Sequence, residues 1–215
     1  MELSDALQTL KAPGRNDIPD CSREDLPALC VKLGYRVGVE IGVREAVFTE
    51  SFAKAGLQII GVDPWMPGET WLCSMRRRRS TSRARQDEVY GIAQQRLASY
   101  PQARLIRATS MDAVKEFPYG SLDFVYIDGN HGFKCVAEDL WEWTNRLKPG
   151  GLMSGHDYDA IAPGLPRDPM TCHVRYVVDA WVAACKITPW YVLGRRGRGG
   201  RERCDKWRSW MWINA

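Results

Sequence analysis

Several features that mark other classes of protein are missing from this sequence of 215 residues. It has no apolar run long enough to cross a bilayer, and its first residues, MELSDALQTLK, have neither the basic start nor the apolar core of a secretory signal. Its seven cysteines include no C-x-x-C pair, which argues against a disulfide framework and against a structural zinc cluster. These absences predict a cytoplasmic protein with reduced thiols and no membrane partner.

The net charge is also small, only +4, but arginine is concentrated in two short segments. One holds Arg76, Arg77, Arg78, Arg79, Arg83 and Arg85, and the other holds Arg195, Arg196, Arg198, Arg201 and Arg203. Such segments are either solvated loops or surfaces that bind an anionic substrate or a nucleic-acid backbone. We expect residues 67–85 to form a lid near the site, with Trp65 and Trp71 either stacking on a ligand or packing in the core.

Short apolar runs alternate with amphipathic segments along the chain, without internal repeats, and this pattern is typical of βαβ units around a largely parallel sheet. Strands are expected at 36–42, 58–65, 103–109, 122–128, 151–156, 188–193 and 207–213. Helices are expected at 23–33, 45–55, 86–100, 111–117, 133–147 and 173–186. KPGG, residues 148–151, should stop the helix before it.

The last two strands are joined by a segment too short and too rich in glycine for a crossover helix, so they should pair as an antiparallel hairpin. The expected fold is α/β: a Rossmann-like, doubly wound sheet of seven strands, mostly parallel with the last strand antiparallel, and helices on both faces. Residues 1–34 are expected to be an N-terminal helical extension or lid, and residues 35–215 the main domain.

The segment VGVEIGVREAVFTE, residues 37–50, has the pattern of a strand, a turn and a helix. Glu40 closes the strand, Gly42 lets the backbone pass close to a ligand, and the helix N-terminus presents free N–H groups. Asp63 ends the next strand, where a carboxylate can accept hydrogen bonds from both hydroxyls of a ribose. This set predicts a cofactor that contains a nucleoside.

The dinucleotide fingerprint G-x-G-x-x-G is incomplete at this turn, because its three positions read Glu40, Gly42 and Glu45. An acidic residue there repels a pyrophosphate but suits the ammonium group of S-adenosylmethionine. The turn therefore favours S-adenosylmethionine over NAD.

The chain resembles the class I S-adenosylmethionine-dependent methyltransferases and, within them, the macrolide-sugar and rhamnosyl O-methyltransferases of the methyltransferase domain family 24 type. The resemblance covers about residues 35–215 and rests on VEIGVREAVFTESF, IIGVDPW, GSLDFVYIDGNHGFKCVAEDLWEWTNRLKPGGLMSGHDY and the tryptophan-rich C-terminal strands. It implies a class I methyltransferase domain with Glu40 and Gly42 against the methionine moiety, Asp63 against the ribose, and Ser110 and Met111 beside the adenine. One departure is Ala46, where such enzymes usually have the last glycine of the motif; a small residue there still permits close packing.

Polar side chains follow two of the expected strands: Asp128, Asn130 and His131 after one, His156 and Asp157 after the next. Ligands of open parallel sheets bind at the carboxyl ends of strands, so both clusters should meet beside the cofactor's methyl group, Asp128 contacting the cofactor as well. Acidic residues on neighbouring strand ends can share a divalent cation such as Mg²⁺. The related sugar methyltransferases have aspartates here, which implies Asp128, His156 and Asp157 as ligands. If His156 is a ligand, it suits a transition metal better than Mg²⁺. Alternatively, His156 lies beside the ligands without contacting the metal.

His131 is the first candidate for the general base, because an imidazole titrates near neutrality and a hydroxyl must lose its proton as it attacks the methyl group. Two readings compete with it: His131 caps the following helix or bonds the backbone, or Asp128 acts as the base with a metal that polarises the substrate oxygen. N-Methylating relatives often carry an Asn/Asp-Pro-Pro-Tyr/Phe motif after this strand. Its absence favours oxygen as the acceptor.

The sequence therefore predicts an S-adenosylmethionine-dependent O-methyltransferase that acts on a hydroxyl of a small sugar-like or polyol molecule. One alternative is a methyltransferase of RNA or another nucleic acid, which would use the arginine-rich segments. A second is a non-catalytic module that binds a nucleoside cofactor, and an NAD enzyme is a distant further alternative. The acceptor's identity and homo-oligomer formation are left open.

Overall fold

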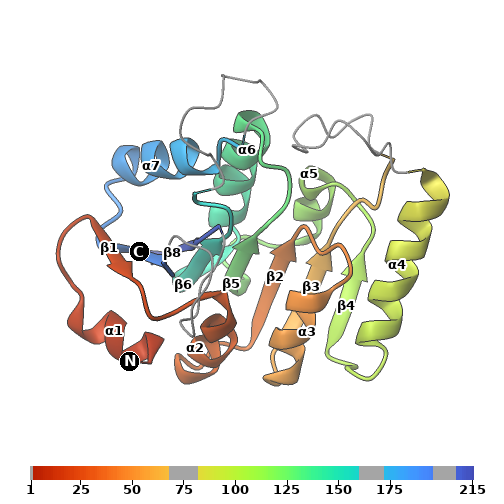
Figure 1. Ribbon diagram of the computed structural model, residues 1–215, viewed down its shortest axis with the longest axis horizontal. Coiled ribbons are helices and arrows are strands. Elements are labelled where there is room, and N and C mark those ends of the chain that lie inside the picture. The colour runs from red at the N-terminus through yellow and green to blue at the C-terminus, as the bar shows by residue number, and fades with distance from the viewer. Residues whose placement is uncertain (1, 68–81, 160–171, 196–206) are drawn as a thin grey trace.

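The computed structural model describes residues 2–67, 82–159, 172–195 and 207–215. Within these residues one eight-stranded sheet runs through the molecule in the order β1-β7-β8-β6-β5-β2-β3-β4 (Figure 1). Its strands are β1 (Arg15–Ile18), β2 (Val37–Ile41), β3 (Gln58–Val62), β4 (Ala103–Ile106), β5 (Leu122–Ile127), β6 (Leu147–Gly155), β7 (Trp190–Leu193) and β8 (Ser209–Ile213). β8 is antiparallel to β6 and β7, whereas the other neighbouring pairs are parallel. The predicted fold class is confirmed.

The central strand β5 shows why the chain forms such a sheet. All six of its residues are buried, and the last four, residues 124–127, alternate between two cores. Val125 and Ile127 pack in the core under one face, whereas Phe124 and Tyr126 pack in the core under the other. A strand covered on both faces appears in the sequence as a continuous apolar run, which is why this strand is predicted correctly.

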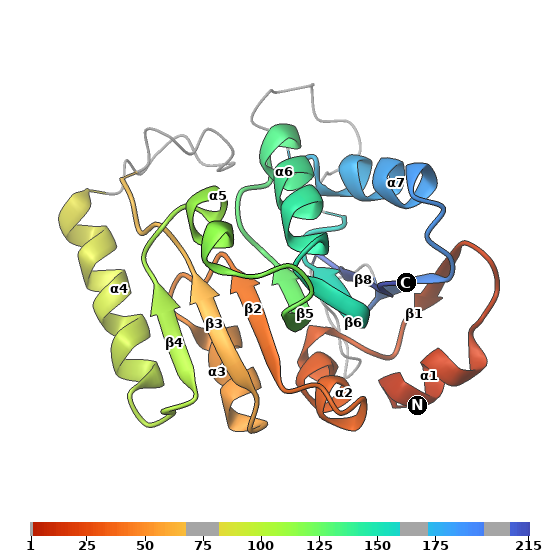
Figure 2. The same cartoon turned by 180° about the vertical axis from the view of Figure 1, so that it is seen from behind.

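Helices cover both faces of the sheet, as predicted (Figures 1 and 2). One face carries α5 (Ser110–Ala113), α6 (Phe133–Thr144) and α7 (Val174–Ala184), and the 3-10 turn η2 (Val114–Glu116) follows α5. The other face carries α1 (Leu3–Thr9), η1 (Arg23–Asp25), α2 (Leu26–Lys32) and α3 (Val47–Lys54), with α4 (Arg83–Leu97) packed beside α3 and β4. None of the helices in the described ranges has the length and apolar character needed to cross a membrane.

The helix α6 begins at Phe133, as predicted, but ends at Thr144 rather than at residue 147. Leu147 and the KPGG turn already belong to β6, which pairs with β5 through a register shift. A Cβ at Gly151 would lie 3.0 Å from the carbonyl oxygen of Asp123, so the turn passes close to β5. The turn thus leads the chain into the next strand within a few residues.

The sheet has one strand more than the seven predicted, because β1 pairs in parallel with β7 at its edge. This short strand and α1 were both missed from the sequence. The segment before residue 35 therefore contributes a strand to the main sheet in addition to its helices, and its boundary as a separate extension stays a prediction. The predicted hairpin is confirmed, since β7 and β8 pair antiparallel, while its connection at 196–206 lies outside the described residues.

Candidate active site

The turn after β2 lies directly against the end of β5. Gly42 has φ +88°, and a Cβ there would stand 2.2 Å from the carbonyl oxygen of Asp128. The Asp128 backbone N–H also donates a 2.7 Å hydrogen bond to the carbonyl of Ile41. Both the left-handed φ and the close approach require glycine at this position. The predicted cofactor turn and the predicted catalytic strand end are therefore neighbours.

Glu40, the last but one residue of β2, is buried with only 2% of its surface exposed. Its carboxyl accepts a 2.5 Å hydrogen bond from the hydroxyl of Thr49 on α3. Burial raises the pKa of Glu40 to about 8; the Thr49 hydrogen bond opposes this shift, the charge of Asp128 adds to it, and Arg23 opposes it. Glu40 is therefore largely protonated at neutral pH, and a cationic ligand beside it would favour its ionised form.

The carboxylate of Asp63, which follows β3, binds the backbone of two turns. Its Oδ2 accepts hydrogen bonds from the N–H groups of Val43 and Arg44 at 3.1 and 3.0 Å, and its Oδ1 accepts one from Trp65 at 2.8 Å. Burial raises the pKa of Asp63, against the effect of these hydrogen bonds. A carboxylate has about four acceptor positions, so about one stays available for a ribose.

Trp65 packs in the core rather than lining a ligand site. It is 1% exposed, and its indole N–H donates a 2.9 Å hydrogen bond to the carbonyl of Arg44. Of the two readings of this tryptophan, core packing is the correct one. Trp71 lies outside the described residues.

Ala46 explains why a glycine is usual at its position. Its φ of +59° is left-handed, and its side chain is fully buried. An L-residue in this conformation costs about 1–2 kcal/mol, which glycine avoids. Alanine keeps the turn because its Cβ is small enough for the site.

Ser110 and Met111 begin α5, whose N-terminus is capped by Thr109. The Ser110 hydroxyl donates a short hydrogen bond to Asp139 and accepts one of 2.8 Å from the indole of Trp143. The Ser110 side chain is thus held by α6, and the contact of Ser110 and Met111 with an adenine stays a prediction.

Asp139, a charged residue of α6, is only 3% exposed. Burial raises its pKa to about 7, despite the hydrogen bond from Ser110. Val136, Asp139 and Trp143 recur at helical spacing on the buried stripe, which is the signal that could have revealed it.

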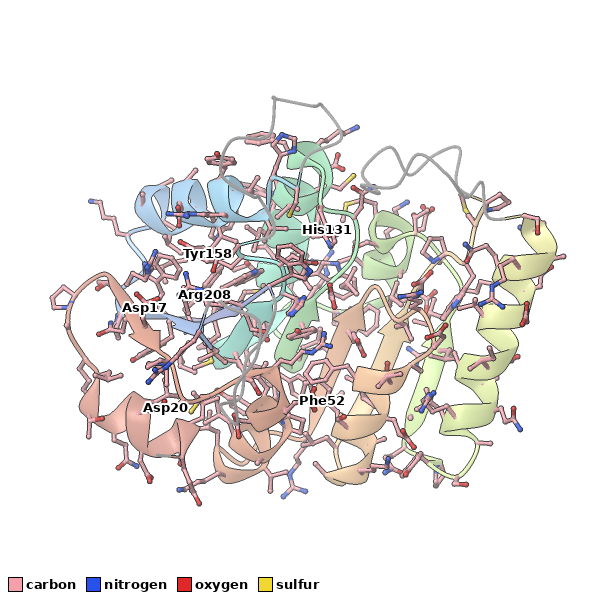
Figure 3. All side chains as sticks on the ribbon, in the orientation of Figure 1. Asp17, Asp20, Phe52, His131, Tyr158 and Arg208 are labelled. Carbon is pink, nitrogen blue, oxygen red and sulfur yellow. The ribbon has the colours of Figure 1, made fainter. Side chains whose placement is uncertain are left out.

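Four ionisable side chains meet where β5 and β6 end. The Nε2 of His131 lies 2.8 Å from Oδ2 of Asp157 and 3.8 Å from Oδ1 of Asp128. The Nδ1 of His156 lies 3.8 Å from the same Asp128 oxygen and 3.6 Å from Oδ1 of Asp157. Figure 3 shows His131 beside the start of α6, above the carboxyl ends of the strands. The structure therefore brings together the two clusters that were predicted to converge.

The His131 side chain does not cap α6. The N-cap residue is Gly132, whose N–H donates to the amide oxygen of Asn130 at 2.9 Å. Burial lowers the pKa of His131, but the neighbouring carboxylates Asp128 and Asp157 outweigh this and raise it to about 10. The imidazole is therefore protonated at neutral pH, whereas its candidacy as general base was predicted from an ordinary pKa.

The two carboxyl groups of the cluster differ in their pKa. Burial raises the pKa of Asp128, and the nearby imidazoles only partly compensate. Burial acts in the same direction on Asp157, but the contacts with His131 and His156 prevail and hold its pKa well below the usual range. Asp157 is thus the permanently ionised member.

The donor set fits a divalent cation. One ligand atom each from Asp128, His131 and Asp157 lie within 4.8 Å of one another. Two carboxylates and one imidazole form a mixed set that suits a transition metal as well as Mg²⁺. His156, a predicted ligand, adjoins this group, and its carbonyl accepts a 3.1 Å hydrogen bond from the indole of Trp210.

Tyr158 fixes the loop that carries Asp157. Its hydroxyl donates a 2.6 Å hydrogen bond to Asp179. The guanidinium groups around its ring, 5.6–5.9 Å from the centroid, belong to Arg15, Arg175 and Arg208. Arg208 also pairs with Asp17 of β1 at 3.0 Å (Figure 3). The N-terminal strand therefore braces the loop after β6, and Asp157, with φ +59°, is held in a left-handed conformation.

Arg23 is a site residue that was not predicted from the sequence. Its Nη1 lies 3.5 Å from Oδ2 of Asp128, although it precedes the expected domain. The sequence around Arg23, in the segment interpreted as a helical extension or lid, does not indicate its contact with Asp128.

The arginine-rich segments contribute little to the described structure. Arg76–79 and most of the second segment lie outside the described residues. Among those described, Arg83 pairs with Asp87, Arg85 with Glu88 and Arg195 with Asp20. Residues 160–171, between β6 and α7, likewise lie outside the described residues.

Comparisons with known proteins agree with this geometry. A family model described as a methyltransferase domain matches residues 36–158. No curated protein matches. Among solved structures, an O-methyltransferase from Bacillus cereus in complex with S-adenosylhomocysteine has a TM-score of 0.63 at 15% identity, covering 90% of this chain and 80% of that one.

Two further solved structures show the same likeness. The O-methyltransferase TomG from Streptomyces achromogenes, involved in tomaymycin synthesis and in complex with S-adenosylmethionine, has a TM-score of 0.59 at 13% identity and covers 90% of this chain and 79% of that one. The N-methyltransferase NodS from Bradyrhizobium japonicum has a TM-score of 0.56 at 14% identity, and the match covers 88% of this chain and 94% of that one. At such identities the likeness shows the fold alone.

Proposed function

Because the chain belongs to the methyltransferase domain family, whose model matches residues 36–158, we propose that it transfers the methyl group of S-adenosylmethionine to a hydroxyl oxygen of a small sugar-like or polyol molecule. The observation that carries this proposal is that the cluster of Asp128, His131 and Asp157 adjoins the cofactor turn, where Gly42 packs against the backbone of Asp128. It offers proton acceptors and cation ligands beside the place where the family binds its methyl donor.

The residues around the turn fit S-adenosylmethionine, which supplies a methyl group on a positively charged sulfur. Glu40 faces the ammonium of the methionine moiety, where the positive charge would lower its raised pKa. Asp63 offers its remaining acceptor position to the ribose. Met111 and the backbone of Ser110 flank the adenine. Asp128, at the end of β5, is close enough to the turn after β2 to contact the cofactor.

Transfer to oxygen requires that the hydroxyl lose its proton as it attacks. His131 acts as base only after its own proton has left, because its pKa is about 10 in the cluster. Asp157 stays ionised and accepts a hydrogen bond from the acceptor hydroxyl, which orients its oxygen. A divalent cation on Asp128, His131 and Asp157 would polarise that oxygen and lower its pKa. Asp128, with its raised pKa, is the second candidate to take the proton.

Oxygen is favoured over nitrogen as acceptor by the sequence after β5. Asp128, Gly129, Asn130 and His131 stand where N-methylating relatives often carry an Asn/Asp-Pro-Pro-Tyr/Phe motif. Of the three similar structures, two are described as O-methyltransferases and one as an N-methyltransferase, so the choice of oxygen rests on the sequence. No observation on the described residues favours a nucleic-acid acceptor.

The test is a transfer assay with labelled S-adenosylmethionine against a panel of sugars and polyols, with amines and RNA as competing acceptors. We expect the wild type to transfer label to a hydroxyl compound. Turnover should decrease by about 100-fold or more in Asp128→Asn and in His131→Gln. The affinity of His131→Gln for the cofactor should be unchanged. Asp112→Asn, at an exposed carboxylate, is the matched control. Label in an amine or in RNA would overturn the choice of acceptor.

A further inference from the structure

Arg23 places its guanidinium beside the carboxylate of Asp128, close enough to Glu40 for its charge to act there. Its side chain is 31% exposed, lies 3.5 Å from Asp128 and covers the ring of Phe48, 5.4 Å from the centroid. Its charge also lowers the pKa of Glu40. We propose that Arg23 binds the α-carboxylate of the methionine moiety of S-adenosylmethionine, so that the segment before β2 forms part of the cofactor site. This inference rests on the proposed function of that site.

The charge of the ligand supplies the first reason. The amino-acid end of S-adenosylmethionine is a zwitterion, with an ammonium and a carboxylate on one carbon. Glu40 and Asp128 suit the ammonium, but they repel a carboxylate. A carboxylate bound beside them therefore needs a compensating cation, and a guanidinium with its planar set of N–H donors matches a carboxylate best.

The position of Arg23 is fixed by the local sequence. It opens η1, where Ser22 and Asp25 form a capping box: the Ser22 N–H donates to Asp25 at 2.9 Å, and the Glu24 N–H donates to the Ser22 hydroxyl at 3.3 Å. Leu26, the first residue of α2, is fully buried in the core beneath. The backbone that carries Arg23 is therefore ordered by packing and by hydrogen bonds.

The contacts of Asp128 separate two regions of the site. Its Oδ2 faces Arg23, whereas its Oδ1 faces the imidazoles of His131 and His156. Because the charge of Arg23 also acts on the carboxyl of Glu40, the Oδ2 side of Asp128 adjoins the predicted cofactor turn. The Oδ1 side adjoins the imidazoles and the candidate cation ligands. Arg23 is therefore placed to contact the amino-acid end of the cofactor rather than the acceptor.

The test compares two ligands that differ by one carboxylate. Calorimetric titration measures the affinity of wild type and Arg23→Gln for S-adenosylmethionine and for its decarboxylated form, which keeps the ammonium, the sulfonium and the adenosine. We expect Arg23→Gln to weaken binding of S-adenosylmethionine by roughly 10- to 100-fold and to leave the affinity for the decarboxylated ligand unchanged or higher. Arg23→Lys keeps the charge but loses the planar set of N–H donors, so its affinity for S-adenosylmethionine should lie between those of wild type and Arg23→Gln.

Lys32→Gln is the matched control, because it removes a cation from the same segment whose ion pairs are with Glu2 and Asp5 at 3.1 and 3.5 Å. It should bind both ligands like wild type. If Arg23→Gln loses affinity for both ligands equally, Arg23 only supports the site or neutralises Asp128. If it loses no affinity, the carboxylate binds elsewhere. Either result overturns this inference but leaves the proposed function standing. A wild type that binds neither ligand would overturn the proposed function together with it.

Discussion

The Nε2 of His131 lies 2.8 Å from Oδ2 of Asp157, so that an imidazole after β5 forms an ion pair with a carboxylate after β6. With Asp128 close by, the pair raises the pKa of His131 to about 10 and holds that of Asp157 low. The cluster therefore favours a positive charge between its carboxylates. A proton on His131 and a divalent cation would compete for that place.

The first prediction concerns the protonation of His131. In chelator-treated protein its imidazole should titrate near pH 10, and Asp157→Asn should lower this pKa by about one unit or more because a negative partner is lost. Asparagine tolerates the left-handed φ of +59° at this position, so the backbone is preserved. The measurement is an NMR titration of the histidine ring signals, and titration of His131 near pH 6.5 in wild type would contradict it.

The second prediction concerns the cation. Zn²⁺ bound by Asp128, His131 and Asp157 must displace the imidazolium proton, so its affinity should rise with pH below about 10, by up to about tenfold per unit. Mg²⁺, which prefers oxygen ligands, should perturb the His131 signals much less. The matched variant is His131→Gln, for which the pH dependence of Zn²⁺ binding should largely vanish. Equal affinity of Zn²⁺ for wild type and Asp128→Asn would argue against this site.

A third prediction links Glu40 to cofactor binding. Its pKa of about 8 means that it is protonated at pH 6.5, where the ligand's own amino group is protonated too. The incoming positive charges favour the ionised carboxylate, so binding should release up to about one proton at pH 6.5 and less at pH 9. Calorimetry in buffers of different ionisation enthalpy measures this release. Glu40→Gln should abolish it, and buffer-independent heats in wild type would refute it.

A fourth prediction uses the buried carboxyl of Asp139. Its pKa is raised from 3.8 to about 7 in the folded protein, so the folded state binds more protons than the unfolded state between these values. The free energy of unfolding should therefore decrease as pH rises from about 4 to about 7, by at most about 1.4 kcal/mol per unit from this group. Urea unfolding at pH 5 and pH 7 should show a smaller decrease for Asp139→Asn. Asp112→Asn, where the pKa is lowered instead, should not reduce it.

The fifth prediction separates steric conflict from backbone strain at Gly42. Gly42→Ala should destabilise the protein by about 2 kcal/mol or more, because its Cβ would meet the carbonyl of Asp128 in addition to the strain of a left-handed φ. Gly56→Ala has a similar φ of +84° with no atom within 4 Å, so it measures the strain alone. Equal decreases of melting temperature in the two variants would contradict the prediction, because the contact between the new Cβ and the Asp128 carbonyl would then add no loss of stability.

Sequence patterns predicted which residues of the candidate site lie together where this follows from strand order. Glu40, Asp63 and Asp128 stand at the ends of apolar runs, and parallel strands place their carboxyl ends at one edge of the sheet. The meeting of His131 with Asp157 follows from the same rule. These residues could be grouped without coordinates because a few topological rules restrict how such a sheet is connected.

What could not be predicted depends on contacts between distant segments. β1 has the sequence RNDI, with two charged residues and alternate exposure, so it lacks the apolar run of a buried strand. The approach of Arg23 to Asp128 follows from how α2 packs on the sheet. The pKa of His131 depends on a carboxylate that lies 2.8 Å away only in the folded chain. Local patterns carry none of this information.

The parallel pairing of β1 with β7 joins the earliest strand in the chain to one of the latest. Such a contact has a large sequence separation, so its closure must wait until nearly all of the chain is available, and during synthesis β1 leaves the ribosome long before its partner. The loop that Tyr158 holds through Arg15 and Arg208 gains its support only at that final step. A nascent chain could therefore form the centre of the sheet early, while the geometry around Asp157 matures last.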